Sequence, residues 1–305
     1  MTTFARNNTA VSRQDAKTPR KSESSKASAS AFLRVFAPLR EARVLAFAVA
    51  MTLPLAAQAH KGWLAPSKTV LDVDQWITVD AGVSTEPFVR DHNPLRLDAL
   101  TITAPDGSTV APENVATGKL RSTFDLQLTQ AGTYRIAVLN EGLMASWDED
   151  GKPKRWRGSP ASFASEVPAK AKGLKVSETR GRVETFATAG KPNDGALKPT
   201  GKGLELVPVS GIADLFVGEG ATFRFLLDGK PAAHLDVDVI RDGTRYRNAI
   251  GEQHLKTDAE GRVKLNWAAP GLHWISASVS DNKASLPLAT ERRASYTATV
   301  EVLSP

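Results

Sequence analysis

The chain is 305 residues long, carries a formal net charge of +6 and contains no cysteine. Its length suggests about two domains, each able to bury a core of its own. Nine of the 39 basic side chains but only three of the 33 acidic ones lie in residues 1–59, which leaves 30 of each in residues 60–305. A segment without net charge has no long-range field to attract polyanions, so nucleic-acid binding is disfavoured.

Residues 1–59 have the three parts of an export signal. A basic segment at 34–43 is followed by an apolar run at 44–57 and then by Ala57-Gln58-Ala59. The apolar run is shorter than the roughly 20 residues that span a bilayer, and it contains Pro54. We therefore predict a signal peptide cleaved after Ala59, export to the periplasm, and no membrane span in the mature chain.

Two further features of the composition narrow the alternatives. Residues 1–33 are too polar to fold and long for the front of a signal, which is consistent with a start codon placed upstream of the native one. The absence of cysteine excludes a thiol nucleophile and any thiolate metal site. A bound metal would have to be held by histidine, carboxylate or backbone groups.

Apolar and polar residues alternate in short runs through the first part of the mature chain. These runs lie at 76–79, 100–102, 124–128 and 134–138, and turn signals such as Pro105-Asp106-Gly107 separate them. A period of two is typical of strands that bury one face, and this spacing of turns is typical of a sandwich. We predict a first β-sandwich domain over residues 60–145.

The same pattern returns near the C-terminus, at 221–227, 235–240, 262–267, 274–279 and 296–302. Residues 204–305 are therefore predicted to form a second β-sandwich domain. The phrase at 130–134 resembles the one at 269–273, because each places a glycine turn before a strand late in its domain. This likeness suggests a weak internal duplication.

Residues 146–203 interrupt the pattern and are predicted to be an insertion followed by a linker. They contain Trp147, Trp156 and a run at 148–155 that changes from acidic to basic. The stretch 178–187 fits either one more strand or a short helix, and 190–203 is rich in glycine and proline. The predicted fold is all-β, with two tandem immunoglobulin-like or transthyretin-like β-sandwiches after the signal peptide.

Four motifs together resemble the DUF 4198 family. They are Ala59-His60-Lys61-Gly62-Trp63-Leu64-Ala65-Pro66, Gly203-Leu204-Glu205-Leu206-Val207-Pro208, Asp228-Gly229-Lys230-Pro231 and Thr257-Asp258-Ala259-Glu260-Gly261-Arg262. The resemblance covers residues 59–303 and implies an exported β-sandwich protein of the bacterial envelope. Such proteins are often labelled periplasmic components of nickel or cobalt transport. The last two motifs occur in many β-sandwiches, so they indicate the fold and not the function.

His60 becomes the first residue if cleavage follows Ala59. Its α-amine and its imidazole can then close a chelate ring around one metal ion, and imidazole suits copper, nickel and zinc. A second imidazole would complete a three-nitrogen site of the histidine-brace type. The candidates are His92, His234, His254 and His273, and His92 is preferred because it lies in a polar loop of the same predicted domain. The alternative is that His60 only satisfies the signal peptidase and lies beside Trp63.

No nucleophile elbow, zinc-protease helix or phosphate loop is present in the sequence. We therefore predict a non-catalytic periplasmic protein that binds copper, nickel or cobalt and serves transport or homeostasis together with an envelope transport protein. A second hypothesis is a two-domain module that binds a carbohydrate or an envelope protein, with Trp147 and Trp156 as a candidate sugar platform. A third is an oxidative copper enzyme built on His60. Asp236 and Asp238 share a strand face and are interpreted as a solvated pair.

Overall fold

The structure is a computed structural model, and it describes residues 60–305. All of these residues belong to one compact unit. The predicted signal peptide and its cleavage site after Ala59 lie outside the described residues. No helix within residues 60–305 is long and apolar enough to cross a membrane.

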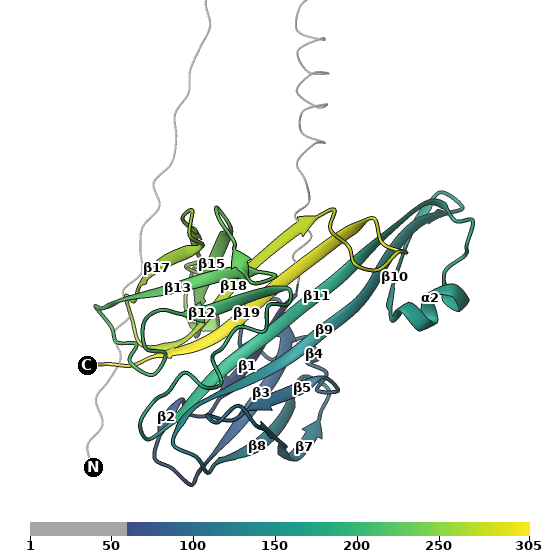
Figure 1. The fold of residues 1–305 in the computed structure, drawn as a ribbon. Coiled ribbons are helices and arrows are strands. Elements are labelled where there is room, and N and C mark those ends of the chain that lie inside the picture. The colour runs from purple at the N-terminus through teal and green to yellow at the C-terminus, as the bar shows by residue number, and fades with distance from the viewer. Residues whose placement is uncertain (1–59) are drawn as a thin grey trace, which may run out of the picture. The chain divides into compact units, whose positions relative to one another are not determined.

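Three β-sheets make up the described chain (Figure 1). The five-stranded sheet consists of β1 (Lys61–Pro66), β3 (Gln75–Ser84), β4 (Asn93–Pro94), β7 (Glu113–Thr117) and β8 (Ser122–Leu128). The four-stranded sheet consists of β12 (Leu204–Pro208), β13 (Gly220–Leu227), β14 (Lys230–Pro231) and β17 (Arg262–Asn266). Both are small beside the third.

The ten-stranded sheet runs through both halves of the chain. It consists of β2 (Val70–Leu71), β5 (Leu100–Thr103), β6 (Thr109–Val110), β9 (Gly132–Glu149), β10 (Lys152–Gly158), β11 (Lys172–Ala189), β15 (Asp236–Arg241), β16 (Gln253–Lys256), β18 (Gly271–Asp281) and β19 (Glu291–Val302). Its path is β16-β15-β18-β19-β11-β9-β5-β6, with β10 beside β9 and β2 beside β11.

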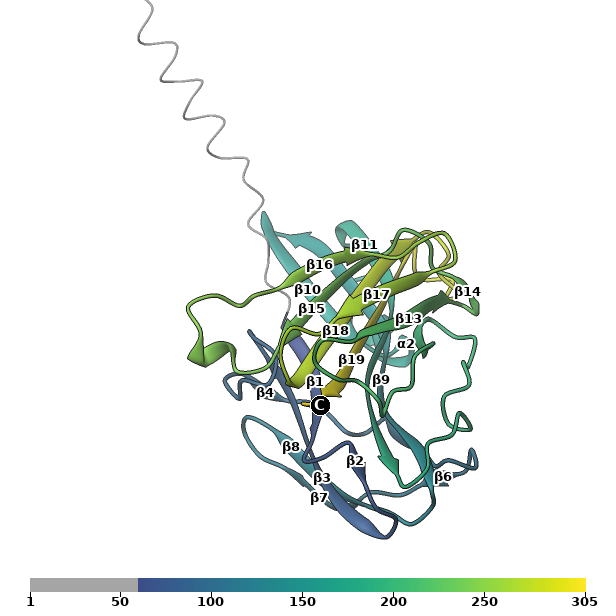
Figure 2. The same ribbon diagram turned by 90° about the vertical axis from the view of Figure 1, so that its left-hand side faces the viewer.

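The two smaller sheets cover different parts of the large one and create two cores (Figure 2). In the first, side chains of β1, β3 and β8 such as Leu64, Val79 and Phe124 pack against β5, β9 and β11. In the second, side chains such as Phe223 and Phe225 of β13 pack against β15, β18 and β19. The prediction of an all-β fold with two immunoglobulin-like β-sandwiches is confirmed.

The segment expected to be an insertion contributes a central strand. Residues 178–187 lie within β11, which pairs antiparallel with β9 and parallel with β19. Of the two alternatives for this stretch, the strand is the one that forms. β9 begins inside the predicted first domain and continues to Glu149, so the sheet is continuous across the predicted limit at residue 145. The domain boundaries themselves stay a prediction.

One short helix, α2 (Pro160–Glu166), follows β10, and one 3-10 turn, η2 (Thr244–Tyr246), follows β15. Ser159 caps α2 by accepting a hydrogen bond from the amide of Ser162, and Pro160 takes the first helical position, where no amide partner is needed. Seven residues are too few to show helical periodicity, so the sequence pattern does not indicate this helix.

The two glycine turns that resemble each other adopt comparable backbone conformations. Gly132 begins β9 with a φ of 135°, and Gly271 begins β18 with a φ of 122°. A Cβ at Gly132 would lie 2.5 Å from Pro105, and one at Gly271 would lie 2.6 Å from Asp242. Glycine is required at both positions by conformation and by space.

Trp63 of β1 lies between the two sandwiches. It is fully buried against Ile240 and Trp274, which both belong to the second sandwich. Its indole N–H donates a hydrogen bond of 2.8 Å to the hydroxyl of Ser84, and the indole N–H of Trp274 donates one of 2.9 Å to the carbonyl of Gly62. These contacts fix the start of β1 on the ten-stranded sheet.

We predict that Trp63→Ala lowers the free energy of unfolding by about 3–5 kcal/mol, because it leaves a cavity between the sandwiches. Urea denaturation followed by far-UV circular dichroism measures the loss. The matched control is Trp76→Ala on β3, whose side chain is 47% exposed. That change is expected to cost about 1 kcal/mol or less. Equal losses for the two variants would contradict the role of Trp63 at this contact.

Candidate functional site

The structure brings together the two histidines predicted to bind a metal. His60 directly precedes β1, and His92 directly precedes β4, so they come from separate parts of the first sandwich. Their ring centroids lie 3.7 Å apart and their planes are 8° from parallel. Both residues are exposed. The sequence favoured this pairing because His92 lies in a polar loop of the same predicted domain as His60.

Contacts of neighbouring residues restrain the segments that contain the two histidines. The ammonium group of Lys61 donates to the carbonyl of Thr85 at 3.3 Å and lies 5.8 Å from the centre of the Trp274 ring. The amide of Thr85 donates to the carboxylate of Asp91 at 3.4 Å, which ties the segment before His92 to the end of β3. Lys61, Thr85 and Asp91 are thus occupied by contacts within the fold. The ring of His60 instead stacks on the ring of His92.

The other three histidines lie elsewhere and in different surroundings. His234 is exposed in the turn before β15 and has a φ of 57°. His254 on β16 places Nδ1 2.7 Å from a carboxylate oxygen of Asp238, and this hydrogen bond raises its pKa. His273 on β18 is buried edge-on against the Trp267 ring, with centroids 4.9 Å apart. None of these three is brought to the His60 ring by the contacts described.

His273 is held neutral by its surroundings. Burial lowers its pKa from 6.5 to about 4, although the hydrogen bond with the carbonyl of Gly271 acts in the opposite direction. The positive charges of Arg241 and Arg247 make smaller contributions to this lowered pKa. This residue takes the place in the second glycine turn that Tyr134 takes in the first, where the Tyr134 hydroxyl accepts a hydrogen bond from the amide of Gln130. Both are buried corner residues.

The tryptophans considered for sugar binding pack inside a small satellite core. Trp147 and Trp156 both pack against the cluster that contains Phe163 of α2, and Trp156 meets that ring edge-on at 5.4 Å. The indole N–H of Trp156 donates to Glu166 at 2.6 Å. Their arrangement explains how α2 is held on β9 and β10. The carboxylates of Asp236 and Asp238 pair with Lys256 and His254 across the exposed β15–β16 pair.

A buried network of charged side chains on β11 was not predicted from the sequence. Glu178, Arg180, Arg182 and Glu184 alternate along one face of the strand. Arg182 pairs with Glu184 at 3.0 Å and approaches Glu205 of β12 at 3.6 Å. Burial alone would lower the pKa of Arg182, but Glu184 and Glu205 outweigh it and raise the pKa. The sequence signal that could have revealed this network is the charged residue at every second position from 178 to 184.

The network continues into the second sandwich. Burial, and then the neighbouring carboxylate of Glu184, raise the pKa of Tyr296 on β19 well above its usual range. The Tyr296 hydroxyl therefore keeps its proton and donates a hydrogen bond of 2.5 Å to Glu184. Glu205 accepts hydrogen bonds of 2.8 Å from the amides of Thr200 and Gly201. The carboxylates of Glu184 and Glu205 thereby join β11 to the linker, to β12 and to β19.

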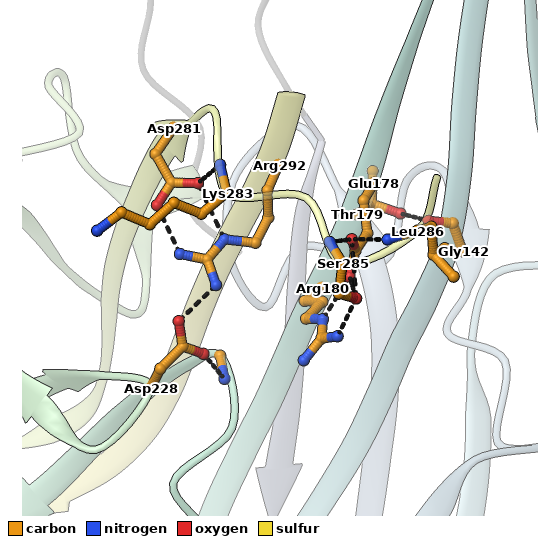
Figure 3. Close-up of polar contacts among 11 residues, drawn as sticks. Gly142, Glu178, Thr179, Arg180, Asp228, Asp281, Lys283, Ser285, Leu286 and Arg292 are labelled. Atoms are coloured by element: carbon orange, nitrogen blue, oxygen red, sulfur yellow. Dashed lines mark hydrogen bonds and ion pairs between the residues drawn. The ribbon is translucent and has the colours of Figure 1, made fainter. Parts of the chain in front are cut away.

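Figure 3 shows the other end of the network. Glu178 accepts hydrogen bonds from the amides of Ser285 and Leu286, at 2.5 and 3.1 Å, and pairs with Arg180 at 2.7 Å. Burial alone would raise the pKa of Glu178, but the bonds from Arg180 and these amides hold the pKa below its usual range. Its carboxylate therefore fastens the loop between β18 and β19 onto β11.

Arg292 of β19 lies between two carboxylates in the same view (Figure 3). It bonds to Asp281 at 2.5 and 3.0 Å and also pairs with Asp228 of the turn after β13. The hydrogen bond to Asp281 is the main cause that raises the pKa of Arg292. Asp228 in turn accepts from the amide of Gly203 at 3.0 Å. This arginine links the two sheets of the second sandwich.

Two open grooves flank the network, with volumes of about 340 and 470 Å³. Arg180 and Arg182 line the first and Arg292 lines the second. All three guanidinium groups are engaged in ion pairs with carboxylates. These arginines are structural partners of carboxylates, at the junction of the sandwiches and within the second one.

The sheets and their cores define a two-sandwich, immunoglobulin-like protein. The sequence profile of the family described as "Domain of unknown function (DUF4198)" matches residues 57–281. The chain therefore belongs to the DUF4198 family, as its motifs indicated. No curated protein matches the chain.

Several solved structures are similar to the chain at low identity. The D0-D1 domain of intimin is 14% identical, covers 79% of this chain and 97% of its own, and gives a TM-score of 0.22. The Yersinia pseudotuberculosis adhesin InvE is 13% identical, with 80% and 61% covered and a TM-score of 0.22. A chimeric titin Z1Z2 is 12% identical, with 82% and 99% covered and a TM-score of 0.19. The fold assignment rests on the sheets described above.

We predict that Glu178→Gln lowers the free energy of unfolding by about 2 kcal/mol, because a buried charge-assisted cluster loses its acceptor charge. Since the folded pKa is lowered, the wild-type contribution is present at neutral pH and is lost as the pH falls through that pKa. Urea denaturation at pH 7 measures the loss. Glu291→Gln on β19 is the control, because its side chain is 54% exposed. Indistinguishable losses for the two variants would argue against an anchoring role for Glu178.

His273 predicts a second pH dependence. Its folded pKa of about 4 lies below the ordinary 6.5, so the unfolded chain binds the proton more tightly. Stability is then fully present above pH 6.5 and falls as the pH drops toward 4, by at most about 3 kcal/mol. His273→Phe is expected to flatten this part of the curve of unfolding free energy against pH.

The exposed His92→Phe is the control for that measurement and is expected to retain the slope. Urea denaturation of both variants at several pH values between 4 and 7 separates them. A slope that survives in His273→Phe would assign the acid sensitivity to other groups.

Proposed function

We propose that the protein is exported, that its mature form begins at His60, and that it binds a transition metal ion through His60 and His92. The observation that supports this most directly is the contact between the two rings, whose centroids are 3.7 Å apart. Copper, nickel or cobalt would be the ion, and the role would be in transport or homeostasis within the periplasm. An envelope transport protein would be the partner.

The residues present fit such an ion by the chemistry of their donor atoms. Two imidazoles supply nitrogen ligands, which copper and nickel prefer to the oxygen ligands favoured by magnesium or calcium. Within residues 60–305, no three or more His, Cys, Asp or Glu side chains are grouped to hold one metal. A third ligand therefore has to come from another group, and the α-amine released by cleavage after Ala59 would provide it.

The surroundings favour a pair of neighbouring ligands over two independent surface side chains, and the stacked rings must turn before their in-plane nitrogen lone pairs point at one ion. Trp63 buries the beginning of β1, and the Thr85–Asp91 bond restrains the segment before His92. Both rings are exposed, so they can turn toward an ion without leaving a packed core. A pair held by the fold loses less conformational entropy on binding than two free side chains would.

The motif that begins at Ala59 gives a further reason to consider His60. Lys61, Gly62 and Trp63 all contact Trp274 of the second sandwich and so hold β1 between the sandwiches. The exposed His60 side chain adds nothing to these contacts. A role as ligand would account for the imidazole at this position, whereas a cleavage-site role would need only a residue that the peptidase accepts.

The test is metal titration of protein produced with His60 as its first residue, with that terminus verified by mass spectrometry. One added residue before His60, His60→Ala or His92→Ala each removes one proposed nitrogen ligand. We predict that each change weakens copper or nickel binding at least tenfold, which is about 1.4 kcal/mol, in isothermal titration calorimetry.

His234→Ala is the matched control, because His234 is an exposed histidine in the second sandwich. It is expected to leave the affinity unchanged. Equal affinities across the whole set would reject the metal site, and so would a terminus other than His60 on the protein recovered from the periplasm. The two-domain binding module would then be the better proposal.

A further inference from the structure

The ends of β9 and β11 extend beyond the two sandwiches as a separate arm, which we define as residues 142–177. Figure 1 shows this arm, with β10 and α2, at the end of the ten-stranded sheet away from the two smaller sheets. It has its own core of Leu143, Ala145, Phe163, Val167 and Val176, with Trp147 and Trp156 packed against it. The arm is therefore a packed element that the sandwiches do not need for their own cores.

The outer edge of the arm is the strand β10. It pairs with β9 from Lys152↔Glu149 to Gly158↔Leu143, and within residues 60–305 no other strand pairs with it. Lys152, Pro153, Lys154 and Arg155 are all exposed. An edge strand has backbone N–H and C=O groups that point away from its neighbour and are available to an added strand.

The side chains of this edge are strongly basic. β10 has the sequence KPKRWRG, with four cations and no carboxylate. Its one ion pair within residues 60–305 joins Lys154 to Glu149 at 2.9 Å. The whole arm carries seven basic and four acidic side chains, whereas residues 60–305 carry equal numbers. The positive charge is thus local to the arm.

The cations of β10 are distributed over both faces of the sheet. Arg155 and Arg157 stand opposite Ser146 and Met144 of β9, and Lys175 of β11 stands on the other side of Ser146. Lys152 and Lys154 belong to the opposite face, since side chains alternate along a strand. A strand added to this edge would meet cations on both of its faces.

Charge determines what can occupy the edge. A second copy of the same strand would place four cations against four, and directly opposed like charges destabilise a strand pair. An extended segment with Asp or Glu at alternate positions would place opposite charges beside Arg155 and Arg157. We infer that β10 is a docking edge for an acidic, extended segment of another protein, which adds to the ten-stranded sheet as a further strand.

This mode combines two sources of affinity. Main-chain hydrogen bonds to the edge supply binding that is independent of sequence, and the charges select acidic segments over neutral or basic ones. Lysine, arginine and proline at an edge also discourage pairing with neutral strands. That discouragement is consistent with a selective edge, and the alternative, an edge that binds no strand at all, is one outcome of the test.

The experiment uses three synthetic eight-residue peptides and the purified protein, with fluorescence anisotropy as the readout. The first peptide alternates Glu and Thr, the second replaces Glu by Lys, and the third is the first with alternate backbone nitrogens methylated. We expect the first peptide to bind and the other two to bind at least tenfold more weakly. The second has positive charges in place of the carboxylates, and the third lacks the backbone N–H donors at the methylated positions.

The protein variants separate the arm from general electrostatics. Arg155→Glu combined with Arg157→Glu is expected to weaken binding of the acidic peptide at least tenfold. The control combines Lys119→Glu with Lys191→Glu, two exposed lysines outside the arm that give the same change in net charge. It is expected to bind as the parent does, and circular dichroism checks that both doubles are folded.

Three results would overturn the inference. The first is no binding of the acidic peptide by the parent at millimolar concentration. The second is equal binding of the methylated and unmethylated peptides, which would indicate charge attraction without strand addition. The third is equal weakening by the arm and control variants. Binding of the parent to anionic phosphatidylglycerol vesicles without binding of the peptide would assign the arm to a membrane surface instead.

Discussion

The parallel pairing of β11 with β19 is the contact on which the rest of the structure depends. It joins nine residue pairs from Ser177↔Glu291 to Thr185↔Thr299, which lie more than a hundred positions apart in the chain. Parallel neighbours need a long crossover, and here the rest of the second sandwich, from β12 to β18, forms it. The two sandwiches are therefore not independent domains joined by a linker, because they share one sheet. Both cores contain side chains of β11, the strand at this junction.

The buried charges follow from that arrangement. Because β11 lies at the junction, its alternate side chains Glu178 and Glu184 are buried and Arg180 and Arg182 are partly buried, so their charges need partners. The partners come from distant segments. Glu184 accepts a hydrogen bond from the hydroxyl of Tyr296, and Glu178 accepts one from the amide of Ser285. A register slip of one residue would turn every one of these charges to the opposite face. The network therefore specifies how β11 aligns as well as stabilising it.

The sequence predicted those features that depend on local pattern. Strands with one buried face alternate with period two, so β3, β8, β13 and β17 could be anticipated. β11 was ambiguous between strand and helix, because both of its faces are covered and charge replaces the usual apolar positions. Its pairing with β19 is set by contacts between distant segments, which no local pattern records. The proximity of His60 and His92 was expected from their shared domain, and the contact of their rings agrees with it. Metal binding itself stays a prediction.

The motifs that carry the family resemblance have mainly structural explanations. Trp63 lies between the sandwiches, Glu205 ties the linker to Arg182, and Asp228 pairs with Arg292. Thr257 accepts a hydrogen bond from the amide of Leu235 at 2.8 Å. Two of these contacts lie at the junction of the sandwiches and two lie within the second sandwich, so the motifs have structural roles. Exposed groups that the fold does not use for its own contacts are then the candidates for function. The imidazole of His60 and the cationic edge of β10 meet that condition, since removing either would leave both sandwich cores complete.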